Sequence, residues 1–331
     1  MKITNNSGIS LPLAVWLLHD DYDYINDPDY ISVTRLMRPL RQIVLPGRIP
    51  FEERTSDVED YIARALGNSI HNSIEYAWKN NLATKLRMLG YKDNLIEKIV
   101  INPDDDLIRS DDSLIPVYIE QRAHREIDTH FGVKRVGGKF DMVADGIPQD
   151  TKSTSAWAWA KGTRDDEHIL QMSMYRWIDA TQPLQKIHED FCQVNYVFTD
   201  WQKSQARSNP AYPQKRVETK TLKLLSLKET EQFIEHKIHE VYTHWKTEEP
   251  KLPECTDEEL WRSAPQFKYF ADPEKAKIPG ARSTKNFDTL HEANQFKTEK
   301  GKGIVVTIPG EVKRCGYCDG FDLCTQKDRY L

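Results

Sequence analysis

The segment 138–152 carries the residues best suited to chemistry. Within it, Asp145-Gly146 is a strong signal for a two-residue β-hairpin turn, because a type I′ turn needs positive φ at both central positions. A hairpin about this turn would place Asp141 directly opposite Asp150. Lys152 would lie on the same face as Asp150, two residues further along the strand.

Two carboxylates opposed on a sheet repel each other, so the predicted pair of Asp141 and Asp150 is destabilising unless something compensates it. A divalent cation between them would do so, and oxygen-rich sites of this kind suit Mg²⁺ or Mn²⁺. Such an ion polarises a phosphoryl oxygen and lowers the pKa of a bound water. Lys152 would orient that water or stabilise developing negative charge. The alternative, from spacing alone, is a surface hairpin with solvated charges.

Two helical segments supply further polar groups at one-turn spacing. His71 follows Gly67 by one turn, and the missing side chain at Gly67 would let the helix approach a sheet so that the imidazole reaches a metal. Gln171 and Tyr175 are also one turn apart and present an amide and a phenol suited to holding phosphate or a catalytic lysine. Taken alone, each pair more often belongs to an ordinary surface or packed helix.

Taken in order, these motifs resemble the PD-(D/E)XK nuclease superfamily, in particular its RecB-type exonuclease branch. That branch carries a G-x-x-x-H helix, an Asp on one strand, a D-x-K on the next strand and a Q-x-x-x-Y on the following helix. The matched span, 67–175, covers about a third of the chain. The resemblance implies a deoxyribonuclease that hydrolyses phosphodiesters by metal-activated water. It favours an exonuclease in recombination, repair or phage DNA processing over a sequence-specific endonuclease.

The same resemblance assigns roles to individual residues. The implied metal ligands are three side chains and one backbone carbonyl, those of His71, Asp141, Asp150 and Thr151. The implied catalytic group is Lys152, with Gln171 and Tyr175 positioning the active site and the DNA strand. Glu120, on the preceding strand, is an accessory carboxylate of lower rank.

Three of the five cysteines, Cys315, Cys318 and Cys324, lie within ten residues of one another. In a chain for which disulfides are not expected, this crowding indicates a metal or cluster site. Cys255 is the preferred fourth ligand because it stands in a loop-like context, whereas Cys192 lies in a predicted buried strand; a non-cysteine group is the remaining alternative. By count, four thiolates suit a [4Fe–4S] cluster or a structural Zn²⁺ equally well.

The spacing of the last three cysteines is similar to that of iron–sulfur nucleases in the same branch, such as AddB-type helicase–nuclease subunits and CRISPR-adaptation nucleases. This resemblance implies a [4Fe–4S] cluster, with Zn²⁺ as the alternative. In those proteins the fourth cysteine usually lies early in the chain, but here no cysteine precedes Cys192. We expect this site to fasten the C-terminal part to the core rather than to catalyse.

Hydrophobic periodicity predicts a helix beginning near Val58. Its expected apolar stripe is Val58, Tyr61, Ile62, Leu66, Ile70, Ile74 and Ala77. The remaining elements alternate strands with helices, with strands at 116–121, 138–144, 149–154 and 191–199 and helices at 166–180, 227–245 and 288–297.

These elements predict an α/β protein with a restriction-endonuclease-like PD-(D/E)XK core, in which helices flank a central mixed sheet. A helical N-terminal part and a C-terminal cysteine-cluster cap would complete it. The expected domains are 1–112 with the G-x-x-x-H helix, 113–249 with the nuclease core, and 250–331 with the cap.

The bulk composition narrows the setting. A net charge of −5 over 331 residues argues against a protein that coats nucleic acid non-specifically. No apolar run approaches the ~18 residues of a membrane span, and no G-x-x-x-x-G-K-[ST] loop is present. We therefore expect a cytoplasmic protein in which any ATP-driven unwinding is left to a partner. The resemblance implies a bacterial or phage-infected cell, single-stranded DNA or duplex ends as the substrate, and a helicase or recombination protein as that partner. The alternatives are a non-catalytic DNA-binding or scaffold module, a structure-specific endonuclease, or a zinc-stapled structural protein.

Overall fold

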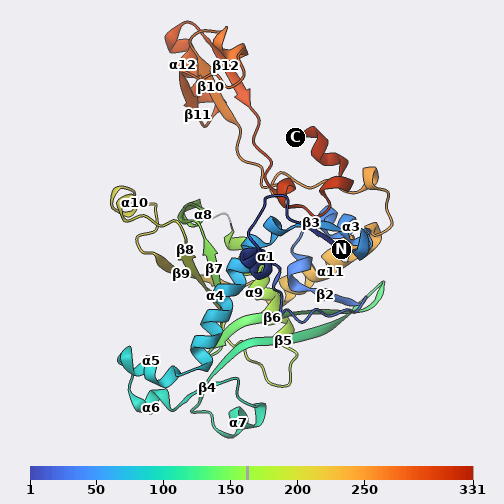
Figure 1. The fold of residues 1–331 in the computed structure, drawn as a ribbon, viewed down its shortest axis with the longest axis vertical. Coiled ribbons are helices and arrows are strands. Elements are labelled where there is room, and N and C mark those ends of the chain that lie inside the picture. Colours follow the sequence, from blue (N-terminus) through green and yellow to red (C-terminus); the bar gives the residue numbers. More distant parts are fainter. Residues whose placement is uncertain (162–163, 331) are drawn as a thin grey trace. The chain divides into compact units, whose positions relative to one another are not determined.

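The computed structural model describes residues 1–161 and 164–330 and divides into two compact units (Figure 1). The first unit comprises Met1–Arg38 and Pro50–Tyr242, and the second comprises Pro39–Ile49 and Thr243–Leu331. This division differs from the three segments expected from the sequence: the first two form one unit, and a short N-terminal segment belongs with the C-terminal unit. That segment is held there by Arg48, whose guanidinium donates hydrogen bonds to the carbonyls of His244, Trp245 and Thr247.

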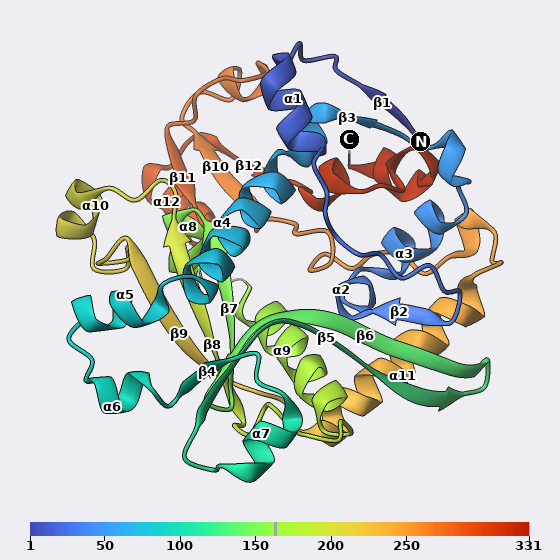
Figure 2. The same cartoon turned by 60° about the horizontal axis from the view of Figure 1, so that its bottom comes forward.

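The first unit is built on a mixed sheet, as predicted (Figure 2). In spatial order its strands are β4 (Ile99–Ile101), β5 (Ile115–Thr129), β6 (Gly132–Ala144), β7 (Ile147–Thr154), β8 (Phe191–Phe198) and β9 (Val217–Lys223), with β2 (Tyr30–Ser32) also pairing with β6. The β5–β6, β6–β7 and β8–β9 pairs are antiparallel, whereas β7–β8, β4–β5 and β2–β6 are parallel. The two long strands β5 and β6 form a hairpin that carries Glu120 and Asp141.

Helices flank this sheet. Those of the first unit are α1 (Leu11–Leu18), α2 (Val33–Leu36), α4 (Ile62–Lys79), α5 (Leu82–Met88), α6 (Asp93–Ile96), α7 (Asp105–Ser110), α8 (Ala156–Lys161), α9 (Asp165–Asp179), α10 (Lys203–Ser208) and α11 (Leu227–His244), the last of which continues into the second unit. A small parallel pair, β1 (Lys2–Thr4) with β3 (Thr55–Asp57), lies apart from the main sheet. None of the helices in the described part of the chain has the length and apolar character needed to cross a bilayer.

The two faces of β8 show how the layers are arranged. Cys192, Val194, Tyr196 and Phe198 alternate along the strand and are buried in the main core with residues of α9 and α11. The intervening side chains, including Asn195 and Val197, line a cleft with Ile74 and Trp78 of α4. Because successive side chains of a strand point to opposite faces, α9 and α11 cover one face and α4 lies over the other (Figure 2).

Helix α4 forms where a helix was predicted, but its expected apolar stripe is buried only in part. Val58 lies in a 3₁₀ turn before the helix, while Ile62 and Leu66 are exposed and the buried hydrophobic residue of α4 is Ala65. The side of the helix that carries His71 faces the sheet instead, because His71 bonds to groups on β6 and β7. The polar contacts of His71 therefore set the rotation of this helix together with Ile74 and Trp78, which lie on the same side.

The second unit contains a small antiparallel sheet and the cysteines. Its regular elements are α3 (Leu40–Gly47), β10 (Gln266–Phe270), β11 (Lys285–Phe287), α12 (Leu290–Lys300) and β12 (Ile304–Ile308), with the strands in the order β11-β10-β12. Phe296 of α12 packs its ring against Tyr269 and Phe287 of the sheet. Short 3₁₀ helices follow β12, at Arg314–Tyr317, Phe321–Leu323 and Thr325–Arg329.

Candidate functional site

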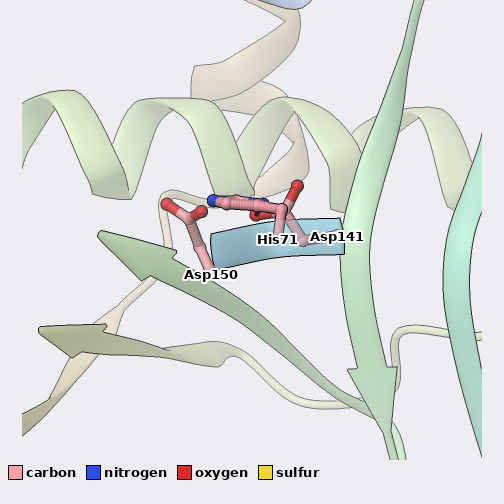
Figure 3. Close-up of side chains that lie close together, drawn as sticks. All are labelled: His71, Asp141 and Asp150. Atoms are coloured by element: carbon pink, nitrogen blue, oxygen red, sulfur yellow. Dashed lines mark ion pairs between the residues drawn. The ribbon is translucent and has the colours of Figure 1, made fainter. Parts of the chain in front are cut away.

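The predicted hairpin turn forms with the expected register. Asp145 and Gly146 have φ values of 50° and 79°, and Met142 pairs with Gln149. The backbone pairing of β6 with β7 ends at these two residues, so Asp141 and Asp150 are the first residues of their strands beyond the paired region. The two strands diverge at this point, and both carboxylates project toward the imidazole of His71 (Figure 3).

His71 joins the two strands. Its Nδ1 lies 3.1 Å from Oδ2 of Asp141, and its Nε2 lies 2.9 Å from the carbonyl oxygen of Thr151. The donor atoms of His71, Asp141 and Asp150 all lie within 4.8 Å of one another, and in the described part of the chain they are the one group of three such donors this close together. The structure thus brings together all four groups that the resemblance assigned as metal ligands.

Burial and mutual repulsion affect the pKa values of the carboxylates in this cluster. Burial, with a further contribution from the neighbouring Asp150, raises the pKa of Asp141 to about 6. The hydrogen bond from His71 opposes this rise, and the same contact raises the pKa of the imidazole. Asp141 therefore competes for a proton close to neutral pH, as expected of two carboxylates that share one buried site.

Asp150 is the more deeply buried carboxylate, with its side chain only 1% exposed. Burial opposes its ionisation, but the charge of Lys152 and the polar contacts with Asp141 and Lys152 together outweigh burial and lower the pKa of Asp150. Lys152 Nζ lies 2.7 Å from Asp150 Oδ2, yet this buried oxygen accepts no hydrogen bond of acceptable geometry from the described residues. An ionised, incompletely satisfied carboxylate oxygen is a strong candidate for a cation ligand.

Lys152 keeps its charge and is partly accessible. Burial disfavours the ammonium, but the two aspartates outweigh burial and raise its pKa. Its side chain is 32% exposed, so the amino group can meet a ligand in the adjoining cavity. At neutral pH Lys152 is therefore a hydrogen-bond donor and a source of positive charge.

The close approach expected at Gly67 is wrong. A Cβ atom placed on Gly67 would meet no heavy atom within 4 Å, so the glycine does not serve helix–sheet packing. It lines instead a cleft of about 360 Å³ together with His71, Asp141 and Lys139. A second cleft of about 340 Å³ adjoins the other side of His71 and Asp141. The glycine leaves room in front of the candidate metal centre.

Gln171 and Tyr175 lie behind the candidate centre. Tyr175 is buried against the backbone of β6, where a Cβ on Gly138 would come within 2.7 Å of its ring, and its hydroxyl donates to the carbonyl of Lys139 at 3.2 Å. Burial raises the pKa of Tyr175. The amide of Gln171 lies 3.5 Å from the Tyr175 hydroxyl. Tyr175 can thus position the strand that carries Asp141, but its burial leaves it unable to contact a DNA strand.

Glu120 lies on the same cleft but outside the three-donor group. It borders both cavities beside His71 and Asp141, and its φ of 55° interrupts the regular pairing of β5 with β6. Its carboxylate forms an ion pair with Lys139 at 2.5 Å. A non-glycine residue in this conformation is unusual and often marks a functional site.

The four favoured cysteines meet in the second unit. Cys255, Cys315, Cys318 and Cys324 line one pocket with Arg41 of α3. Cys192, the rejected candidate, is buried in β8 of the first unit. Burial raises the pKa of the Cys255 thiol to about 12 and also raises the pKa values of Cys315 and Cys318. Ionisation of these thiols at neutral pH therefore requires a cation.

Comparisons with known proteins add little to this geometry. No family model matches the chain, and no curated protein matches it. Among solved structures, the one titled "Crystal structure of SSO0001" has a TM-score of 0.42 and 16% sequence identity, covering 69% of this chain and 83% of that one. A likeness of this extent carries no argument about function, so the site is interpreted from its own residues.

His168 is a residue that the sequence interpretation missed. It is buried on α9 and lines a cavity of about 250 Å³ with Lys152 and Gln171. Burial, with a further contribution from the Lys152 charge, lowers the pKa of His168, so the imidazole is neutral. The signal was available: His168, Gln171 and Tyr175 recur at i, i+3 and i+7, which places them on one helix face.

Proposed function

We propose that this chain is a Mg²⁺- or Mn²⁺-dependent deoxyribonuclease with a PD-(D/E)XK core and a cysteine-cluster cap. The observation that carries the proposal is the convergence of His71, Asp141 and Asp150 within 4.8 Å, beside the ammonium of Lys152. These groups come from a helix and two strands, so chain proximity alone does not explain their meeting.

The donor set fits a hard divalent cation. It comprises two carboxylates, one imidazole and the Thr151 carbonyl that His71 contacts. One carboxylate has a raised pKa and the other a buried oxygen without a hydrogen bond, and a cation would relieve both. When bound, the cation would polarise a phosphoryl oxygen and lower the pKa of water.

Lys152 would act as an electrostatic group in this reaction. In the metal-free protein the two aspartates raise its pKa, which favours the ammonium over a neutral amine that could act as a general base. Its ammonium instead can donate a hydrogen bond to a phosphate oxygen on which negative charge develops. Asp150 would hold that ammonium in place through their 2.7 Å ion pair.

The clefts beside the centre suit a DNA strand. The larger one has Trp16 and Tyr22 as aromatic groups, and aromatic rings stack on unpaired bases, which favours a single-stranded substrate. Its cationic groups, Arg64 and Lys139, form ion pairs with Asp20 and Glu120, so a phosphate would compete with these carboxylates for them. The exonuclease assignment, and a helicase or recombination protein as partner, rest on the resemblance alone.

The cysteine pocket is proposed to hold a [4Fe–4S] cluster, with Zn²⁺ as the alternative. Four thiolates fit either group. The resemblance to iron–sulfur nucleases is what favours the cluster. In either case we expect the site to stabilise the second unit.

The deciding experiment is a cleavage assay with purified protein on DNA labelled at either end. Single-stranded and duplex substrates should be compared with Mg²⁺, with Mn²⁺ and with EDTA. We expect metal-dependent shortening from an end, faster on single strands, and none with EDTA. Intact DNA under every metal condition, with the folded state verified, would contradict the proposal; internal cuts would replace the exonuclease assignment by an endonuclease.

A further inference from the structure

The pocket of the four cysteines contains a buried arginine whose N–H groups all have hydrogen-bond acceptors. Arg41 lies in α3 and is 3% exposed. A guanidinium has five N–H groups and no acceptor, and each buried one needs a partner. In Arg41, Nε donates to the carbonyl of Pro253, and one terminal nitrogen donates to the carbonyls of Glu249 and Leu252.

The remaining terminal nitrogen of Arg41 has two acceptors. One is the carboxylate of Glu249, with which it forms a close ion pair, and the other is Sγ of Cys324 at 3.3 Å. The number of acceptors then equals the number of N–H groups, and the sulfur completes the set. A thiolate accepts such a hydrogen bond much more strongly than a neutral thiol, because charged acceptors form stronger bonds. The arrangement therefore suits Cys324 as a metal-bound sulfur.

Neighbouring hydrogen bonds fix the segments that carry Cys324 and Cys255. Glu249 also accepts hydrogen bonds from the backbone N–H and the hydroxyl of Thr325, the residue after Cys324. Gln326, itself buried, bonds through its amide to both the N–H and the carbonyl of Cys255. Two cysteines from segments about seventy residues apart are thus fixed by polar side chains that bind no metal themselves.

We infer that Arg41 is a positioning residue of the four-cysteine site, which orients the Cys324 thiolate and stabilises the anionic, metal-loaded form. The inference rests on the metal site proposed above but not on the identity of the metal. Four thiolates with Zn²⁺, or with a [4Fe–4S] cluster in its 2+ state, both carry a net charge of −2. An N–H donor aimed at a ligand sulfur stabilises either one, and in a cluster it also raises the reduction potential.

The test compares Arg41→Lys with Arg48→Lys. Lysine keeps the charge but offers three donors in place of a planar fork. Arg48 is a matched control from the end of the same helix, because it also binds three backbone carbonyls but no sulfur. The readouts are the iron and zinc content, the rate of metal release to a chelator, and the reduction potential or, for zinc, the absorption of the Co²⁺-substituted protein.

We expect Arg41→Lys to bind metal about tenfold more weakly, as loss of an outer partner of a metal ligand usually does, with a lower reduction potential or an altered Co²⁺ spectrum. Arg48→Lys should match the parental protein in both. Equal release rates and spectra in the two variants would overturn the role of Arg41. A parental protein that holds neither iron nor zinc after anaerobic reconstitution would overturn the metal site itself, and the inference with it.

A second variant covers the case in which Arg41→Lys does not fold. Glu249→Gln keeps an oxygen acceptor for Arg41 but removes the carboxylate that balances its charge. We expect a higher reduction potential, or for zinc a slower release, because the positive charge of Arg41 beside the Cys324 sulfur is then no longer neutralised. Faster release with an unchanged potential would mean that Arg41 and Glu249 only brace the fold.

Discussion

The two candidate metal sites differ in what holds their donor atoms. His71, Asp141 and Asp150 lie on an 18-residue helix and two strands of the main sheet. The cysteines lie in 3₁₀ turns and loops, and their segments are tied by Arg41 and Gln326. At the first site, the helix and strands that carry the ligands form without a metal. At the second site, we expect the bound metal itself to help hold the segments together.

This difference predicts different consequences of losing a ligand. A hydrogen-bonded sheet with one face packed in the main core keeps its fold when one polar side chain is removed, so loss of a ligand at the first site should affect chemistry. Segments without regular structure depend on their cross-links, and metal binding to thiolates is coupled to folding. Loss of a ligand at the second site should therefore lower the stability of the fold more than it changes the chemistry of the folded protein.

The largest effect is expected for Asp150→Ala and Lys152→Ala. Each removes a group that stabilises charge in the reaction, so cleavage should fall at least ~100-fold. Thermal unfolding should show a folded protein in both variants, and the gain in stability on adding Mn²⁺ should persist only in Lys152→Ala. Asp145→Asn is the matched control: it removes a charge from the same hairpin, and asparagine tolerates the turn conformation. Parental rates in either alanine variant would contradict the site.

The next largest effect is expected for Cys318→Ser, and it should fall on stability. Loss of one of four thiolates should remove most of the iron or zinc and lower the melting temperature of the second unit. Cys192→Ser serves as the comparison, since Cys192 is buried in β8 of the first unit and should leave the metal content unchanged. The measurement is metal analysis together with calorimetry. A Cys318→Ser variant with the same metal content as the parental protein would contradict the role of Cys318 as a ligand that stabilises the second unit.

The first site was accessible to sequence reasoning because its chemistry is mostly local. The Asp145-Gly146 turn determines the strand register, and the register brings Asp141 and Asp150 together within ten residues of chain. Helical spacing also pointed to His71. Spacing does not reveal what a helix face packs against, which is why the roles expected of Gly67 and of Leu66 in the apolar stripe were wrong.

The second site was accessible only in part. The cysteine cluster is visible in the sequence, and comparing the contexts of Cys255 and Cys192 favoured the cysteine that lines the pocket. Arg41 could not be found in this way, because its acceptors lie more than two hundred residues along the chain. For the same reason the sequence placed Pro39–Ile49 with the N-terminal part, whereas it belongs to the second unit. Long-range polar contacts leave no periodic signal.

A smaller effect is expected for His71→Ala, which would test whether α4 belongs to the metal centre. Loss of one of four ligands should raise the Mg²⁺ or Mn²⁺ concentration for half-maximal cleavage by about tenfold, with less change in the rate at saturating metal. His19→Ala is the control, because His19 lines the same cleft outside the three-donor group. If the metal titration were unchanged, His71 would be a packing residue.

The smallest effect concerns pH and also distinguishes the sites. In the metal-free protein the pKa of Asp141 is raised to about 6. The folded state then holds this proton more tightly than the unfolded state, so stability falls as pH rises from ~4 through ~6. His71 also has a raised pKa, so its contribution is present below its ordinary pKa and lost as pH rises through the folded value.

Both groups therefore make the metal-free protein less stable with rising pH. Mn²⁺ binds the deprotonated groups, so it should raise the melting temperature more at about pH 8 than at about pH 5. The measurement is thermal unfolding with EDTA or Mn²⁺ across this range. Asp141→Asn should flatten the pH dependence of stability, because it removes the carboxyl group whose pKa is raised. The same group is the partner that raises the pKa of His71. A stabilisation by Mn²⁺ that is equal at both pH values would mean that the ion binds elsewhere, and that the two carboxylates meet without serving a metal.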